Sequence, residues 1–333
     1  MERAAKWQNT KADLTRIFEA NKGLATVVRK EVGDHLSGKR FAILALLVLV
    51  TCLGSLYVAA STIRTNVGQD ELEFVFLRLF TTSGSSMPFS FLSFISFLGP
   101  LVGLTLGFDA INGERDRRTL SRVLSQPIFR DALINGKFLA GVIVISIVVF
   151  GLGFLVAGLG LIMTGVPPTL GELARLITYL VLSVIYISFW LALAILCSLL
   201  FRQTSTSALA GIAIWLFMAF FLTLLAGMAA DGIYPVNDNS DSQQIIANAK
   251  TEQMISRISP AYLYSEAVTS IMNPAVRSMG PVLLEQAYGA IKGTLTFSQS
   301  LLLIWPQVVC LIAEMLICFA IAYISFMRQE IRA

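Results

Sequence analysis

Charged residues are scarce in this chain, and their scarcity argues against a soluble protein. Of its 333 residues, 14% are charged and 56% are hydrophobic, and the mean hydropathy is +0.73. The charges fall in short blocks that separate long apolar runs. A helix satisfies its backbone hydrogen bonds within itself, as a segment inside a bilayer must. The composition therefore predicts an all-α membrane protein with several spans.

Histidine and cysteine are also rare. His35 is the only histidine and lies before the first apolar run, so neither an H-E-x-x-H metal site nor a Ser-His triad can form within the membrane. Asp109 is the lone aspartate at the end of an apolar run, which argues against a paired-aspartate membrane protease. The four cysteines lie inside apolar runs, and we expect small core residues without disulfides. These absences disfavour a membrane-embedded enzyme.

A complete nucleotide-binding loop is missing as well. Residues 33–40, GDHLSGKR, come within one residue of the P-loop pattern G-x-x-x-x-G-K-[ST]. Arg40 stands where the hydroxyl that binds magnesium should be, and a long apolar run follows. We interpret the stretch as a charged entry into a membrane span. We expect no metal site and no cofactor bound by this chain.

Six apolar runs are long enough to cross a hydrocarbon core of roughly 30 Å. They lie near residues 41–60, 87–109, 138–163, 177–200, 207–229 and 300–326. Nine lysines and arginines fall in residues 1–40 and six in 110–137, against two in 61–86 and one in 164–176. By the positive-inside rule both termini are cytoplasmic. We expect a transmembrane domain over 41–333, with a large external loop over 230–299.

Residues 1–40 form a predicted cytoplasmic segment that contains an amphipathic helix. Within residues 13–36, apolar side chains recur at helical spacing and basic ones occupy much of the remainder. Such a helix lies in the membrane interface, with its basic groups near anionic lipid headgroups. Anchoring alone and anchoring combined with a partner contact are both open interpretations.

The segment between the second and third spans, residues 110–137, is too elaborate for a simple connector. Glu114 and Arg118 lie four residues apart on a predicted short helix and can support it. Pro127 ends that helix, and Asn135-Gly136 is expected to break the chain before the third span. We predict a compact cytoplasmic helix-turn-helix. The alternative is a solvated charged loop that only enforces topology.

The residue order in this segment resembles the signature of ABC-2 type transporter permeases, particularly their NosY-like branch. From Asp109 to Lys137 it reads D-A-I-x-x-E-R-x-x-x-T-L-x-x-x-L-S-x-P-I-x-R-x-x-x-x-x-G-K. Shorter matches at 29–31, 198–210, 259–264 and 327–331 extend the resemblance over nearly the whole chain. Arg118 departs from the pattern, because relatives often have glycine there.

The resemblance implies that this loop carries the coupling helix, which docks on an ATP-binding subunit. Carried over by position, the ATPase-coupling residues are Asp109, Glu114, Arg115, Arg118, Thr119, Leu120, Leu124, Pro127 and Arg130. Arg29, Lys30 and Glu31 resemble the family's entry helix before the first span.

The family resemblance also implies a function and its partners. The chain would be the permease subunit of an ABC exporter in the cytoplasmic membrane of a prokaryote. Its partners would be two ATPase subunits, which bind ATP and Mg, a second permease chain and membrane lipids. The second permease chain could be identical to this one or different from it. Nucleic acid is not an expected partner.

Glu314 is the one ionisable residue near the middle of a span. A charge there costs at least a few kcal/mol, so the side chain should face protein or water, or be protonated. One interpretation places Glu314 and Gln307 on the translocation path or at the dimer seam. The other is a protonated carboxyl that is hydrogen-bonded to a neighbouring helix, near Gln307. An ion-gradient-driven secondary transporter that uses Glu314 is the alternative function, although no internal repeat supports it.

Overall fold

The computed structural model describes residues 23–66, 74–83, 89–118, 129–237, 240–276 and 294–329. Within these residues six helical segments are long and apolar enough to cross a membrane, which confirms the predicted all-α fold. They are α2 Lys39–Asn66, α4 Phe91–Gly107, α7 Arg130–Thr164, α8 Leu170–Leu200, the continuous α9 Thr204–Leu216, η1 Phe217–Phe221 and α10 Leu222–Ile233, and α14 Phe297–Arg328. The shorter helices are α3 Val75–Thr81, α5 Asn112–Asp116, α11 Ser242–Ser256 and α12 Pro260–Met272.

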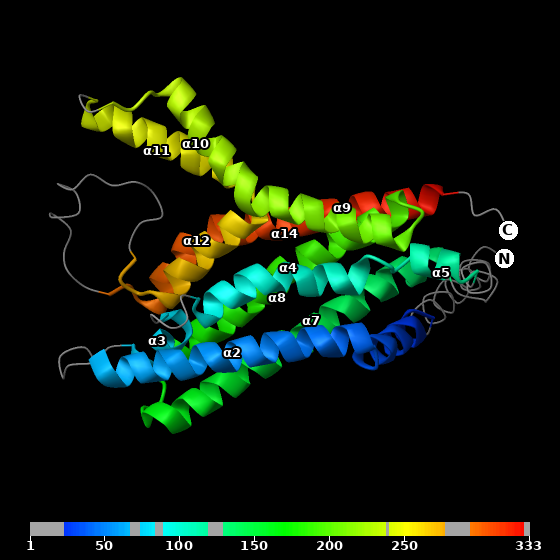
Figure 1. Cartoon of the computed structure of the whole chain (residues 1–333), viewed down its shortest axis with the longest axis horizontal. Coiled ribbons are helices and arrows are strands. Elements are labelled where there is room, and N and C mark those ends of the chain that lie inside the picture. Colours follow the sequence, from blue (N-terminus) through cyan, green and yellow to red (C-terminus); the bar gives the residue numbers. More distant parts are fainter. Residues whose placement is uncertain are drawn as a thin grey trace, which may run out of the picture.

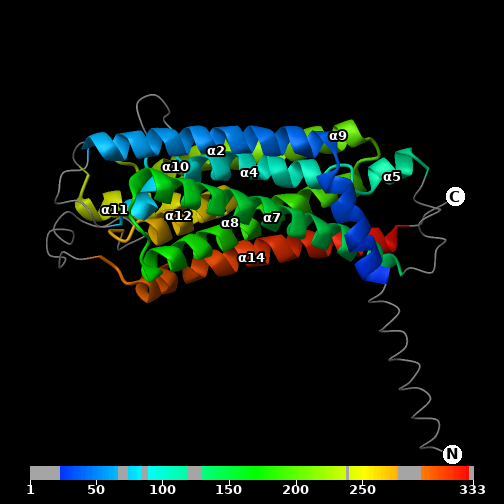
Figure 2. The same ribbon diagram turned by 90° about the horizontal axis from the view of Figure 1, so that it is seen from below.

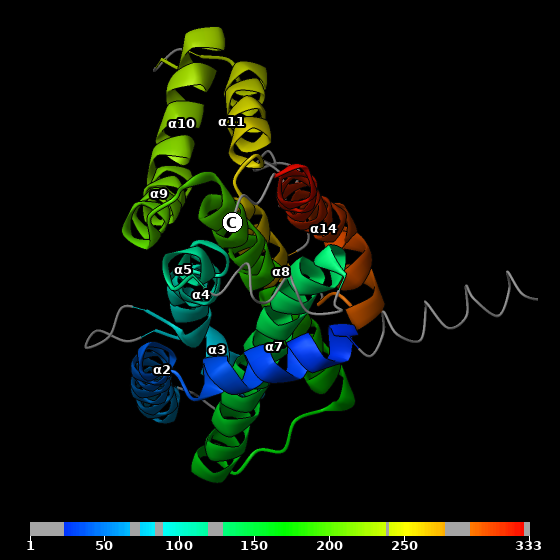
Figure 3. The ribbon, with the colours of Figure 1, turned by 90° about the vertical axis from the view of Figure 1, so that its right-hand side faces the viewer.

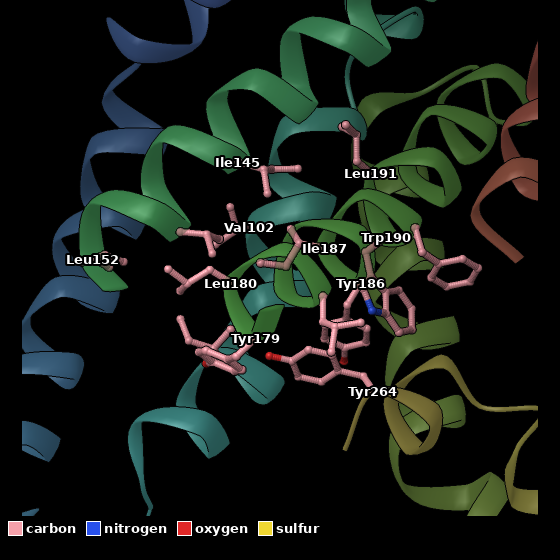
Figure 4. Close-up of a cluster of buried hydrophobic side chains, with 14 of the residues drawn as sticks. Val102, Ile145, Leu152, Tyr179, Leu180, Tyr186, Ile187, Trp190, Leu191 and Tyr264 are labelled. Atoms are coloured by element: carbon pink, nitrogen blue, oxygen red, sulfur yellow. The ribbon is translucent and has the colours of Figure 1, made fainter. Parts of the chain in front are cut away.

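Helix α8 lies at the centre of the bundle (Figure 1, Figure 3), where it packs against α4, α7, α9, α12 and α14. Tyr186 and Trp190 of α8 are fully buried, and Tyr186 stacks on Tyr264 of α12 with ring centroids 4.3 Å apart (Figure 4). The Tyr264 hydroxyl lies 2.7 Å from Ser183 Oγ, and the Tyr186 hydroxyl donates to the Ser96 carbonyl at 3.0 Å. Packing and satisfied polar groups together fix this core.

Helices α4 and α8 approach closely because α4 presents glycines to α8. Gly99, Gly103 and Gly107 recur at intervals of four residues. A Cβ added to Gly103 would lie 2.6 Å from the Ile187 carbonyl oxygen and 3.0 Å from the Leu191 backbone nitrogen. Rows of small residues let membrane helices bring their backbones together.

We therefore expect Gly103→Ala to push α4 away from α8 and to destabilise the protein. Overpacking of this kind typically costs about 1–3 kcal/mol. The matched control is Gly151→Ala in α7, because a Cβ there meets no atom within 4 Å. Thermal unfolding in detergent should show a lower melting temperature for Gly103→Ala only. Equal melting temperatures for the two variants would contradict the close approach.

Helices α7 and α8 begin before the predicted spans, at Arg130 rather than 138 and at Leu170 rather than 177. The start of α8 is fixed by a capping box, in which the Glu172 amide donates to Thr169 Oγ1 and the Thr169 amide donates to Glu172 Oε2. Apolar composition marks only the bilayer part of a helix. Polar turns beyond that part are not visible in a hydropathy pattern.

The segment between the fifth and sixth spans folds back toward the bundle. Helix α11 lies beside α10 and extends away from the other helices (Figure 1), whereas α12 packs against α4, α8, η1 and α14. Where α12 begins, Ser259 Oγ donates to the Met218 carbonyl of the π-helix η1 at 2.9 Å. Although the sequence predicted a large external loop over 230–299, α12 within it lies among the spans, because Leu263, Tyr264 and Ile271 are buried against them.

Arg175 fixes one end of α8 to this segment. Its side chain is buried and donates to the Ile271 carbonyl at 2.8 Å, the Leu295 carbonyl at 2.6 Å and Ser300 Oγ at 2.9 Å. These acceptors belong to α12, to the residues before α14, and to α14 itself. A single guanidinium therefore joins three elements.

All four cysteines are free, as predicted. Cys52, Cys197 and Cys318 are buried, but Cys310 is exposed on α14. The prediction of a core position was wrong for Cys310, because an apolar run contains lipid-facing and core-facing positions alike.

Candidate functional site

A buried ion cluster lies at the end of the bundle that we predict to be cytoplasmic. The helix over residues 23–36 crosses this end, from α2 across α7 toward α14 (Figure 2, Figure 3). Lys137 Nζ, in the first turns of α7, lies 2.9 Å from Glu31 Oε1 and 2.8 Å from Glu114 Oε1. Lys30 Nζ lies 3.2 Å from the same Glu31 oxygen. These four residues, the Lys137 cluster, join helix 23–36 and α5 to the third span.

The Lys137 cluster is largely removed from water. The Lys137 side chain is 6% exposed, and those of Glu31 and Glu114 are 10% and 15% exposed. Burial alone would raise the pKa of the Glu31 carboxyl, but Lys137 and Lys30 outweigh it and hold that pKa below its ordinary value. Glu31 therefore stabilises the folded protein at pH values above the unfolded-state pKa of its carboxyl. This stabilisation is lost as the pH falls through the lower, folded-state pKa.

Helix 23–36 lies directly on α7. A Cβ added to Gly136 would lie 2.6 Å from Val27 Cγ1, and Val27 is buried. The prediction that Asn135-Gly136 breaks the chain was wrong, because α7 runs unbroken from Arg130 through this pair. The glycine makes room for the neighbouring helix and does not end its own.

Helix α5 is attached to the connection between α8 and α9. The backbone N–H groups of Ile111 and Asn112 donate to Ser198 Oγ at 2.9 and 3.1 Å, and Ser198 Oγ donates to Asn112 Oδ1 at 3.1 Å. Ser207 Oγ, in α9, donates to the Phe108 carbonyl at 2.8 Å. A displacement of α5 would therefore act on α4, α8 and α9.

The end of the sixth span joins the same assembly. Arg115 Nη2 donates to Gln329 Oε1, and Arg130 Nη2 donates to the Gln329 carbonyl, both at 2.9 Å. The Arg130 guanidinium also lies 5.6 Å from the centre of the Phe326 ring. Gln329 Nε2 in turn donates to the Leu199 carbonyl of α8 at 3.1 Å.

The predicted helical pair of Glu114 and Arg118 does not form. Helix α5 ends at Asp116, and Arg118 has a left-handed φ of 55°. The spacing of four residues assumed a helix that continues through both positions, whereas Glu114 instead pairs with Lys137. The other predicted coupling residues, Thr119, Leu120, Leu124 and Pro127, lie outside the described residues.

Of the entry-helix residues, Glu31 is buried in the Lys137 cluster and Arg29 is exposed. Lys30 pairs with Glu31 and, at 3.4 Å, with Asp34. Burial lowers the pKa of Lys30, but these carboxylates outweigh it and raise that pKa above its ordinary value.

Residues 33–40 do not form a phosphate-binding loop. Helix 23–36 leads into a turn at 37–38, and α2 begins at Lys39, whereas a P-loop follows a strand. Arg40 Nη1 lies 3.2 Å from Asp109 Oδ2, so the predicted coupling residue Asp109 is paired with the start of the first span. This stretch and the Lys137 cluster line a cavity of about 810 Å³. Burial holds the pKa of His35, which also lines it, below its ordinary value.

Gln307 and Glu314 lie on α14, apart from this cluster. Gln307 is buried, and its Nε2 donates to Glu266 Oε2 of α12 at 3.0 Å. Glu266 also pairs with Arg257 at 2.9 Å. One oxygen of Glu314 is buried without a hydrogen-bond partner among the described residues. Among the described residues Glu314 makes no hydrogen bond to a neighbouring helix, whereas the amide of Gln307 binds α12.

The sequence did not identify the centre of this site. Lys137 is the last residue of the signature, but the resemblance gives it no role in coupling. Nothing in the sequence points to Ser198 or Gln329 as residues of the site. The one signal of this site in the sequence was the position of Lys137, a lysine directly before the apolar run of the third predicted span.

The fold thus defines a multi-pass helical membrane protein, and comparison with known proteins gives its family. Residues 25–331 match the model of the ABC-2 family transporter protein. Because this match covers nearly the whole chain, the chain belongs to the ABC-2 family of transporter proteins.

Two relatives are named as probable ABC transporter permease protein NosY. The protein from Stutzerimonas stutzeri is 29% identical over 197 residues, which cover 59% of this chain and 66% of that protein. The protein from Pseudomonas aeruginosa is 30% identical over 209 residues, covering 60% and 69%. The match thus spans about two thirds of each relative. The predicted permease family is confirmed.

Proposed function

We propose that this chain is the permease subunit of an ABC exporter, and that its cytoplasmic end couples the spans to a separate ATPase. The observation that carries the proposal is the Lys137 cluster, in which one buried lysine holds both helix 23–36 and α5 against α7. A loop that only sets the orientation of the spans does not require a buried lysine with two ion-pair partners, because exposed charges are sufficient to orient a membrane protein.

The contacts of α5 suggest how motion is transmitted. Asp116, Arg117 and Arg118 are exposed at the tip of α5 and form the described surface that a partner would contact. The N–H of Ile111, at the start of α5, donates to Ser198 of α8, while Glu114 of α5 binds Lys137 of α7 and Arg115 of α5 binds Gln329 beyond α14. A rigid displacement of α5 by an ATPase would therefore tilt several spans together.

The assembly follows from the number of spans. Six helices are too few to enclose an alternating path for a sizeable cargo, so the working unit contains two permease chains and two ATPases. By analogy with the family, the complex resides in the cytoplasmic membrane of a prokaryote. ATP and Mg bind to the ATPase subunits.

Assembly and ATP use can be tested together with the purified chain and a co-expressed ABC ATPase. Native mass spectrometry should show two copies of each subunit, and only the complex should hydrolyse ATP. Lys39→Ala should leave this hydrolysis unchanged, because residues 33–40 are not a nucleotide site. A monomeric permease that functions with one ATPase, or transport that follows an ion gradient without ATP, would contradict the proposal.

A further inference from the structure

A second cavity lies at the other end of α4 from the Lys137 cluster, and its chemistry differs. It has a volume of about 580 Å³ and is lined by residues of α4, α8, the fifth span and α12. None of its described lining residues is charged, and none is histidine, cysteine or methionine. In the cavity beside the Lys137 cluster, by contrast, half of the lining residues are lysine, arginine, aspartate or glutamate.

One wall of this uncharged cavity is aromatic. Phe97 of α4 and Trp215 of α9 meet edge to face, with ring centroids 5.2 Å apart. Trp215 is buried as a residue, but its Nε1 atom is not among the fully buried ones, and its indole N–H donates to no partner among the described residues. An indole N–H in a buried position usually has an acceptor. Because Trp215 lines the cavity, a ligand placed there could supply this acceptor.

Hydroxyl groups line the rest of the cavity. Ser96, Thr223 and Thr269 contribute side chains that make no hydrogen bond to other described residues. Elsewhere in the spans such hydroxyls donate to the preceding helical turn, as Thr105 does to the Leu101 carbonyl at 2.6 Å. These three cavity hydroxyls are therefore available to a ligand.

This lining restricts the chemistry of the ligand. An ion would lose its hydration without meeting a counter-charge, which is costly at the depth of the spans. A transition metal would need thiolate, imidazole, thioether or carboxylate ligands, none of which is among the described lining residues. A purely apolar ligand would leave the indole N–H and the three hydroxyls unsatisfied.

We propose that this cavity binds an uncharged amphiphile that carries hydroxyl groups. Its apolar part packs on Phe97 and Trp215, and its hydroxyls bond to the indole N–H and to Ser96, Thr223 and Thr269. The amphiphile is the class of cargo that this permease moves, and this assignment of cargo rests on the proposed function.

The cavity also touches the parts of the fold that can change its shape. Helix α4 lines this cavity near its first residues and leads at its other end to Asp109 and α5. A displacement of α5 would therefore shift the wall of the cavity that α4 forms. Another wall includes residues of the π-helix η1, in which the Met218 carbonyl accepts a hydrogen bond from Ser259 Oγ. π-helical turns inside α-helices frequently occur at functional sites.

The binding test uses the purified chain in lipid nanodiscs without any ATPase. Three photoreactive probes share one octyl chain and differ in headgroup: glucoside, glucuronate and trimethylammonium. The glucoside should label residues of the cavity, mapped by mass spectrometry, and unmodified octyl glucoside should compete. Both charged probes should label these residues about tenfold less, because the cavity offers no counter-charge.

Variants separate the cavity from general partitioning into lipid. Trp215→Phe and Thr223→Val should each reduce glucoside labelling about fivefold, the loss expected for one hydrogen bond. Trp305→Phe is the matched control, because Trp305 is exposed on α14 and does not line the cavity. Thr269→Asp introduces a carboxylate at an exposed position of the lining and should make trimethylammonium the preferred probe.

Equal labelling by the three probes would overturn the inference, and so would undiminished glucoside labelling in both Trp215→Phe and Thr223→Val. Failure of this test with an intact, ATP-hydrolysing complex would leave the proposed function in place. Conversely, selective glucoside binding by a chain that never associates with an ATPase would overturn the proposed function and the assignment as cargo, but not the binding site.

Discussion

Lys137→Met should lower the free energy of unfolding by about 3–5 kcal/mol and abolish ATP-driven coupling. The methionine removes the cation that contacts both Glu31 and Glu114, and it leaves these carboxylates largely buried. Removing one partner of a buried ion pair is costly because the remaining charge keeps its desolvation penalty. Thermal unfolding of the purified chain measures the first effect, and ATP hydrolysis by the complex measures the second.

Two further variants show whether the cluster is the cause. Lys39→Met is the matched control, since Lys39 is exposed and forms no ion pair with a described residue. The triple variant Lys137→Met, Glu31→Gln, Glu114→Gln removes all three charges and should recover most of the stability, but not the coupling. If Lys137→Met were as stable and as active as Lys39→Met, the role of the Lys137 cluster would be refuted.

Arg175→Met should loosen α12 from the bundle and lower the free energy of unfolding by about 3–5 kcal/mol. It leaves the Ile271 and Leu295 carbonyls and Ser300 Oγ without their buried donor. A hydrogen bond to a charged group contributes about 1.5–3 kcal/mol, and unsatisfied acceptors add to the loss. Hydrogen–deuterium exchange should rise selectively in residues 260–272.

Arg175→Lys should rescue only part of this effect, because an ammonium lacks the planar fork that reaches several acceptors at once. Arg202→Met is the control, since Arg202 is exposed and makes no hydrogen bond or ion pair with a described residue. Unchanged exchange in α12 of Arg175→Met would show that the helix is held by packing alone.

The sequence predicted the spans because a bilayer imposes a long apolar run on each of them. It did not predict that α12 lies among them, because a helix from Pro260 to Met272 is too short to be recognised as membrane-embedded and follows a polar stretch. The same reason applies to α3 in a predicted external loop, whose buried residues are Val75, Phe76, Leu77, Leu79 and Phe80.

The candidate site could be predicted only in part. The signature placed Glu114, Arg115 and Arg130 in one segment, and the structure brings them together with Glu31 and the end of the last span. The pairing of Lys137 with Glu31 joins positions 106 residues apart. A single sequence carries no information on such a contact, because local spacing predicts only pairs within one helix.

The proposed docking of α5 on an ATPase is tested by cross-linking in the assembled complex. Arg117→Cys would be placed in a chain whose four native cysteines are replaced by serine, with Tyr234→Cys at the opposite end, which is predicted to be external, as the control. A short bismaleimide should join Arg117→Cys, and not Tyr234→Cys, to a cysteine on the ATPase surface that faces the membrane. Cross-linking from Tyr234→Cys, or none from Arg117→Cys in a complex that hydrolyses ATP, would contradict the coupling site.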